Sequence, residues 1–295
     1  MITKYIQRSK ELQTSHRVIC DGFLTVALLK TEKAKPYIEE AESFYKALKG
    51  TKSISHLLLL KNYRNALIST CGFSDKAKSK LTDAELDDSV KQVLDRIYKE
   101  TGERFREEIL YRYLLTKGDA LGGRMRNLAG ANAGVKLVER ILNQLSERKI
   151  DVKTIRSKVG KIQRIIWNGR MLLFDVTPKL IHKNIDVILL NSGKSELSEK
   201  ELLSDKGKYI ACGELKGGID PAGADEHWKT ANSSLDRIRK AFGRSCPALF
   251  FVGAAIEASM AKEIFTQLKK NKLSYAANLN DDNQVDDLVN WLIRL

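Results

Sequence analysis

The segment GELKGG, residues 213–218, ends an apolar stretch with a carboxylate and an ammonium group two positions apart. Residues two apart on a β-strand share one face, so Glu214 and Lys216 are expected to point the same way. A second carboxylate, Asp186, interrupts the apolar run NIDVILL at 184–190. A buried, unpaired carboxylate is costly, so Asp186 is expected to face a metal ion, a lysine or solvent at a strand end.

Together these residues form the pattern D-x27-ExK, which combines two carboxylates with one lysine. The side chains of Asp186 and Glu214 and the carbonyl of Leu215 are the kind of ligands that Mg²⁺ takes. Such an ion would polarise a phosphodiester and acidify a water molecule, and Lys216 would offset the developing charge. The chemistry predicted is in-line hydrolysis of a phosphodiester bond. The alternative is a simple salt bridge between Glu214 and Lys216, because so short a pattern is common.

The composition favours a polyanionic partner. Lys and Arg number 51 against 37 Asp and Glu, which gives a formal charge of +14 and a pI of about 9.5. Such an excess is typical of nucleic-acid binding, although it also serves solubility. The four cysteines have no metal-binding or paired spacing, which predicts reduced thiols and a cytoplasmic protein. The sequence has no apolar run long enough to span a membrane, so no membrane association is expected.

The spacing of apolar residues changes along the chain. Residues 4–126 follow a helical period, whereas short apolar runs bounded by turn residues alternate with helical patterns farther on. The strands are predicted at 165–176, 184–191, 208–216, 247–255 and 273–279, and helices at 225–242, 258–270 and 285–295. We therefore expect a helical region at 1–126, which would grip DNA and dimerise, and an α/β catalytic domain at 127–295 with a mixed sheet flanked by helices.

The run ELKGGIDPAGADEHWKTA, residues 214–231, with an aspartate 28 positions before its glutamate, resembles type II restriction endonucleases of the AvaI/BsoBI group. These belong to the PD-(D/E)XK superfamily, where NID here replaces the usual proline–aspartate. The resemblance implies a PD-(D/E)XK core, a homodimer enclosing duplex DNA, and Mg²⁺-dependent cutting at CYCGRG to leave 5′ overhangs. It carries over Asp186, Glu214 and Lys216 as the catalytic residues.

Residues after this motif have two interpretations each. The resemblance implies that His227 contacts the attacking water, for which an imidazole is suited, but it could equally be a packing or capping residue. Carboxylates accept hydrogen bonds from cytosine N4 in the major groove, which makes Asp220, Asp225 and Glu226 candidate base readers. For Asp225 we favour a helix N-cap, with Glu226 complementing the helix dipole.

Weaker candidates precede the sheet. Glu139 could be an additional acid near the metal or a solvated helix residue. Arg124, Arg126 and Lys136 flank the small-residue segment NLAGANAG, where phosphate contact or dimer packing would both explain them.

Two further classes of protein remain possible: a structure-specific or repair nuclease of the same fold, and a non-catalytic DNA-binding protein. A nucleotide cofactor is not expected. The segment NSGKSE has only the second half of a phosphate-binding loop, and its first glycine would fall at Ile188.

Overall fold

The structure, a computed structural model, describes residues 3–73, 75–193 and 198–295, with all side chains except those of Asp75, Lys76 and Arg126. It divides into two compact units. One combines Met1–Leu24 with Asn127–Leu295, and the other is Thr25–Arg126. The first 24 residues thus group with the sheet-containing half, whereas their sequence pattern predicted that they belong to the helical region at 1–126.

Buried hydrogen bonds explain why the N-terminal segment belongs to the sheet-containing unit. The Asn278 amide donates to the Leu12 carbonyl at 3.0 Å and to the Thr14 hydroxyl at 2.9 Å. The Gln284 amide donates to the Glu11 carbonyl at 2.7 Å. Because unsatisfied buried polar groups are costly, these bonds fix the segment onto the end of the sheet.

The helical unit has its own apolar core. Phe44, Leu94, Phe105 and Tyr113 are among the side chains that it buries completely or almost completely. The helices that form it, two of which also contribute residues to the other unit, are α1 (His16–Lys49), α2 (Ile54–Leu58), α3 (Arg64–Thr70), α4 (Asp75–Lys78), α5 (Asp83–Thr101) and α6 (Phe105–Glu147).

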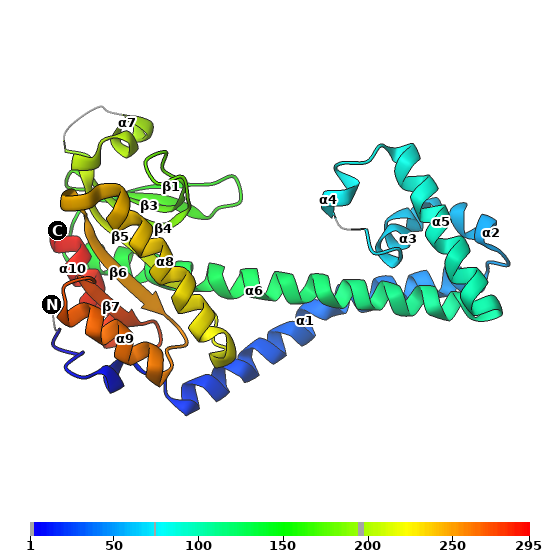
Figure 1. The fold of residues 1–295 in the computed structure, drawn as a ribbon, viewed down its shortest axis with the longest axis horizontal. Helices are drawn as coiled ribbons and strands as arrows, with labels where there is room; N and C mark the ends of the chain where they lie inside the picture. The colour runs from blue at the N-terminus through cyan, green and yellow to red at the C-terminus, as the bar shows by residue number, and fades with distance from the viewer. Residues whose placement is uncertain (1–2, 74, 194–197) are drawn as a thin grey trace. The chain divides into compact units, whose positions relative to one another are not determined.

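The sheet-containing unit, residues 1–24 and 127–295, is built on a seven-stranded sheet in which the strands follow one another in sequence order (Figure 1). Its strands are β1 (Lys153–Arg156), β2 (Ile162–Trp167), β3 (Arg170–Val176), β4 (Ile185–Asn191), β5 (Tyr209–Lys216), β6 (Ala248–Gly253) and β7 (Tyr275–Asn278). Neighbours from β1 to β5 are antiparallel, and β5, β6 and β7 are parallel. The parallel strands are joined through helices, as crossover connections require.

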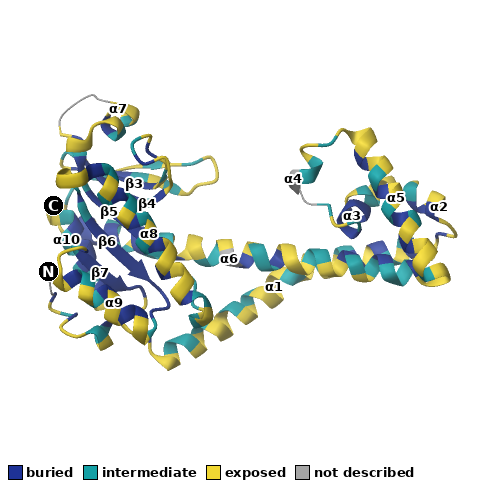
Figure 2. Ribbon diagram, in the orientation of Figure 1, coloured by how far each residue is buried: buried dark blue, intermediate teal, exposed yellow. Residues whose placement is uncertain are grey.

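Helices cover both faces of this sheet. The first face carries α8 (Ala224–Phe242) and α9 (Ala258–Lys269), and the short α7 (Glu199–Ser204) connects β4 with β5. The C-terminal part of α6 and α10 (Asp282–Arg294) pack on the second face. The central strands are therefore buried on both sides, as the dark ribbons of Figure 2 show.

The predicted mixed sheet flanked by helices is confirmed, with one omission. The sequence pattern did not predict β1 or the first half of β2. β1 is an edge strand of four residues, of which only Ile155 is even partly buried, so it has no apolar alternation that could be recognised. The single strand predicted at 165–176 is divided into β2 and β3 by a hairpin turn at Asn168 and Gly169, and both residues have positive φ angles, 41° and 73°, as a type I′ turn requires.

Candidate active site

The pairing of β4 with β5 determines which side chains face each other. The two strands are antiparallel with Val187 opposite Gly213, and continuing this register by one residue sets Asp186 opposite Glu214. Directly opposed residues project on the same face of a sheet, and Lys216, two positions beyond Glu214, shares that face. Asp186 and Glu214, although 27 residues lie between them, therefore meet in one site on the α8 side of the sheet.

The ammonium of Lys216 lies between the two carboxylates. Its Nζ is 2.9 Å from Glu214 Oε2 and 3.2 Å from Asp186 Oδ2. The backbone N–H of Leu215 also donates to Asp186 Oδ2, at 2.8 Å. The three predicted catalytic side chains therefore meet, and the Leu215 peptide connects them.

Burial makes the two acids unequal. The Glu214 side chain is 4% exposed, whereas those of Asp186 and Lys216 are 21% and 22% exposed. Desolvation, reinforced by the neighbouring charge of Asp186, raises the pKa of Glu214 to about 7. The two carboxylates in turn raise the pKa of Lys216 despite its partial burial, so the lysine stays charged.

The donor set fits a hard divalent cation. Glu214 Oε1 is buried and makes no well-aligned hydrogen bond; the Ser234 side chain of α8 is near enough to lower the pKa of this carboxyl but leaves the oxygen available to a ligand. In the described part of the chain, no three acidic, histidine or cysteine side chains are grouped so that they could hold a metal ion. A site with two carboxylates must therefore take further oxygen ligands from the backbone, such as the Leu215 carbonyl, and from water, as Mg²⁺ commonly does.

Two close contacts fix the loop that follows β5. A Cβ atom at Gly217 would lie 2.5 Å from the Ala129 carbonyl oxygen and 2.6 Å from the Ala133 methyl group of α6. Gly22 of α1 is similarly close to Ile219, whose Cγ1 would be 2.3 Å from a Cβ there. At Gly217 the space is filled by α6, because Ala129 and Ala133 belong to its small-residue segment NLAGANAG, for which the sequence indicated phosphate contact or dimer packing.

His227 lies in a niche made by two glycines of the same loop. Its Nε2 would be 3.3 Å from a Cβ atom at either Gly218 or Gly223, so a larger residue at these positions would press on the ring. The imidazole is on an exposed residue in the first turn of α8. The niche holds the ring beside the loop that leaves the catalytic strand.

The acidic candidates have local partners. Asp220 caps the short 3₁₀ turn Pro221–Gly223 by accepting from the Ala222 N–H at 2.9 Å. Asp225 and Glu226 are exposed, and both pair with Lys229 one turn farther along α8. The prediction that Asp225 is the N-cap is wrong. The helix begins at Ala224 with Gly223 as its cap, because the preceding 3₁₀ turn leads straight into it.

The weaker candidates lie away from the acid cluster or outside the description. Lys136 forms an ion pair with Asp282 of α10 at 3.0 Å. Glu139 is exposed on the part of α6 that covers the opposite face of the sheet, so the structure does not bring it to Asp186 and Glu214. In the helical unit, the Arg124 guanidinium lies 5.4 Å from the ring centre of Tyr37. The side chain of Arg126 is outside the described residues.

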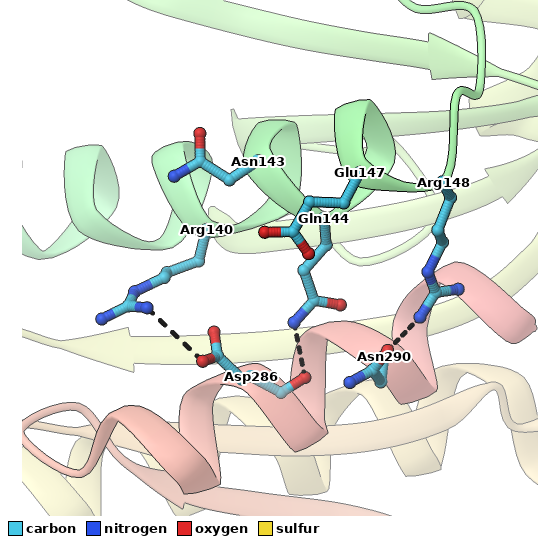
Figure 3. A pocket seen from close by; sticks show the side chains of 7 residues that line it. All are labelled: Arg140, Asn143, Gln144, Glu147, Arg148, Asp286 and Asn290. Atoms are coloured by element: carbon cyan, nitrogen blue, oxygen red, sulfur yellow. Dashed lines mark hydrogen bonds and ion pairs between the residues drawn. The ribbon is translucent and has the colours of Figure 1, made fainter.

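A polar pocket between α6 and α10 is separate from this cluster (Figure 3). It is lined by Arg140, Asn143, Gln144, Glu147, Arg148, Asp286 and Asn290. Its polar groups largely satisfy one another, since Arg140 and Gln144 both bind Asp286 and Arg148 binds Asn290. The pocket is a polar seam that joins the two helices.

The fold and the acidic cluster define an α/β restriction endonuclease, with a PD-(D/E)XK-like arrangement on two adjacent strands. Comparison with known proteins agrees. The family model "Restriction endonuclease BsobI" matches residues 2–295, and the chain belongs to this family. The type II restriction enzyme BsoBI of Geobacillus stearothermophilus is 38% identical over 99% of this chain and 97% of its own length. The type II restriction enzymes AvaI of Nostoc and of Anabaena variabilis are each 39% identical over 99% of this chain and 98% of theirs.

The chain is accordingly a type II restriction enzyme by family, that is, a site-specific endonuclease acting on double-stranded DNA. Among the described residues, the helices are all too short or too polar to cross a membrane.

Proposed function

We propose that this protein is a homodimeric, Mg²⁺-dependent endonuclease that cleaves both strands of duplex DNA at CYCGRG and leaves 5′ overhangs. The observation that carries the proposal is the convergence of Asp186, Glu214 and Lys216 on one sheet face. The recognition sequence and the overhang follow from the resemblance of residues 214–231 to the AvaI/BsoBI group.

In this proposal Asp186, Glu214 and the Leu215 carbonyl hold the cation. Bound there, Mg²⁺ would supply charge stabilisation at the phosphate and a more acidic water. Lys216, already held near both carboxylates, orients the nucleophile and offsets the charge that develops on the phosphate oxygens. We assign proton transfer to His227, which is exposed beside the loop that follows β5.

DNA reading is assigned to the loop that follows the catalytic strand. The carboxylate of Asp220, which is exposed at the start of its 3₁₀ turn, can accept from cytosine N4. Asp225 and Glu226 are secondary candidates, because Lys229 already neutralises them. Contacts with the phosphate backbone are assigned to Arg124, Arg126 and Lys136, the last after it is released from Asp282. The helical unit is assigned to gripping the duplex.

A palindromic site relates the two scissile phosphates by a twofold axis, so two identical active sites are required and a homodimer follows. We also infer that the protein acts in the cytoplasm, where its cysteines, all four of them unpaired, would stay reduced. No nucleotide cofactor enters the proposed reaction.

The test is digestion of sequenced plasmid DNA with Mg²⁺, followed by mapping of the cut ends. Cuts confined to CYCGRG with 5′ overhangs are expected from the wild-type protein. Lys216→Ala is expected to abolish cutting while specific binding survives, because the lysine stabilises charge during the reaction and makes no base contact in this assignment.

Three outcomes would contradict the proposal. Cutting without a fixed sequence would indicate a structure-specific or repair nuclease. Binding without any cutting by the wild-type protein would indicate a non-catalytic DNA-binding protein. Unchanged nicking by Lys216→Ala would show that the active site has been placed wrongly.

A further inference from the structure

The turn between β1 and β2, residues 157–161, lies at the same end of the sheet as the catalytic cluster. Each strand from β1 to β5 is antiparallel to the next, so β1, β3 and β5 run in one direction. Their C-terminal ends, at Arg156, Val176 and Lys216, therefore share one edge of the sheet. In Figure 2 the turn is an exposed loop that projects from the sheet.

This turn is basic. Arg156, Lys158 and Lys161 are exposed, and the only acid paired with them among the described residues is Asp175, which binds Lys161. In the part of the chain that the structure describes, no ion pair involves Lys158. The neighbouring connection between β3 and β4, residues 177–184, is also basic and adds exposed lysines at the same edge.

Two other connections at the same edge carry acids. Those that follow β6 and β7 contain Glu257 and Asp281, each at the start of a helix. These two connections therefore attract a polyanion less than the β1–β2 turn does.

The turn is already ordered for contact. Ser157 N–H donates to the Lys161 carbonyl at 2.8 Å, and Gly160 N–H donates to the Ser157 carbonyl at 2.9 Å. Gly160 adopts a φ of 82°, which suits glycine, and the Arg156 guanidinium donates to its carbonyl at 3.0 Å. A partner would pay little ordering entropy here. Val159 at the tip is 89% exposed and is available for apolar contact.

We propose that the β1–β2 turn is a DNA-contacting arm in which Lys158 binds a backbone phosphate outside the catalytic centre. The proposal rests on the proposed function, since it takes duplex DNA as the partner. Three strand spacings separate β1 from β4, about 14 Å in all. In this proposal the duplex axis runs across the strands, and the separation then equals about four base pairs, which is the expected distance of the contacted phosphate from the scissile bond.

The first experiment measures binding of the full-length protein to a cognate duplex, with Ca²⁺ in place of Mg²⁺, over a series of salt concentrations. Lys158→Ala is compared with Lys200→Ala, which removes an exposed lysine from α7, between β4 and β5 at the opposite end of the sheet. For Lys158→Ala the slope of log Kd against log salt should fall by about 0.9, or about 3.5-fold less loss of affinity between 50 and 200 mM salt. Lys200→Ala should keep the wild-type slope.

The second experiment locates the contact. Single neutral methylphosphonates are placed along the duplex, and a substitution about four base pairs from the cut should weaken wild-type binding but leave Lys158→Ala unaffected. If wild-type protein cuts its site while Lys158→Ala matches Lys200→Ala in both experiments, the arm is refuted and the lysine serves only to prevent pairing at the sheet edge. Failure of the wild-type protein to bind or cut a specific site would instead refute the proposed function.

Discussion

Replacing Glu214 by glutamine is expected to remove a pH dependence that the active site imposes on stability. Burial and Asp186 raise the pKa of Glu214 from 4.5 to about 7. The unfolded chain therefore ionises this group at a lower pH than the folded protein does. The free energy of unfolding should fall as pH rises between these values and level off above the folded pKa.

The size of this effect follows from the shift. The rise of the pKa from 4.5 to about 7 corresponds to about 3 kcal/mol, most of which is expressed between pH 5 and pH 8. Because Glu214 is 4% exposed, solvent screening reduces this figure little. Glutamine has nearly the same shape but no titrating proton, so the variant lacks the dependence.

Urea unfolding of the wild-type protein and of Glu214→Gln, at pH 5 and pH 8 without divalent cations, measures this pH dependence of stability. The stability of the wild-type protein relative to Glu214→Gln should fall by about 2–3 kcal/mol between the two pH values. Titratable groups away from the site are common to both proteins and cancel in the comparison, whereas Asp186 and Lys216 interact with Glu214 and are part of the measured difference. A stability difference that is the same at both pH values would refute the raised pKa and the burial argument behind it.

Cleavage by the wild-type protein should show the opposite trend. The ionised fraction of a group with a pKa of about 7 rises about tenfold, from roughly 9% to roughly 91%, between pH 6 and pH 8. Since Mg²⁺ must displace the proton, cleavage at subsaturating Mg²⁺ should rise by a similar factor, and saturating Mg²⁺ should flatten the profile.

Two substitutions test the loop after the catalytic strand. Asp220→Ala should relax discrimination at the cytosine positions by about 1–3 kcal/mol per base, as measured by cleavage of single-base variants of the site, and an unaltered preference would remove Asp220 from the reading residues. Gly217→Ala should destabilise the protein by about 1–3 kcal/mol and slow cleavage, because its methyl group would collide with Ala129 and Ala133. The control is Gly134→Ala, which adds a methyl group in open space on α6, the helix that carries Ala129 and Ala133, and should not destabilise the protein. Equal thermal stability of the two variants would refute this packing argument.

The catalytic strands could be predicted because their signals are local. Asp186, Glu214 and Lys216 stand out as charges within short apolar runs, and the spacing of two places Glu214 and Lys216 on one face of any strand. The apolar stripe of α8 is equally local, and Trp228 and Leu235 are buried as its period requires. The edge strand β1 gave no such signal because its side chains are largely exposed.

By itself, the sequence determined the residue types of the site, the elements that carry them and the excess of positive charge, since these depend on composition and on spacing within one strand or helix. Only the tertiary structure decided the register that sets Asp186 opposite Glu214, the burial that raises the pKa of the latter, and the attachment of the N-terminal segment through Asn278. It also decided that α6 fills the space at Gly217. These features arise from contacts between residues far apart in the chain, for which no local period exists.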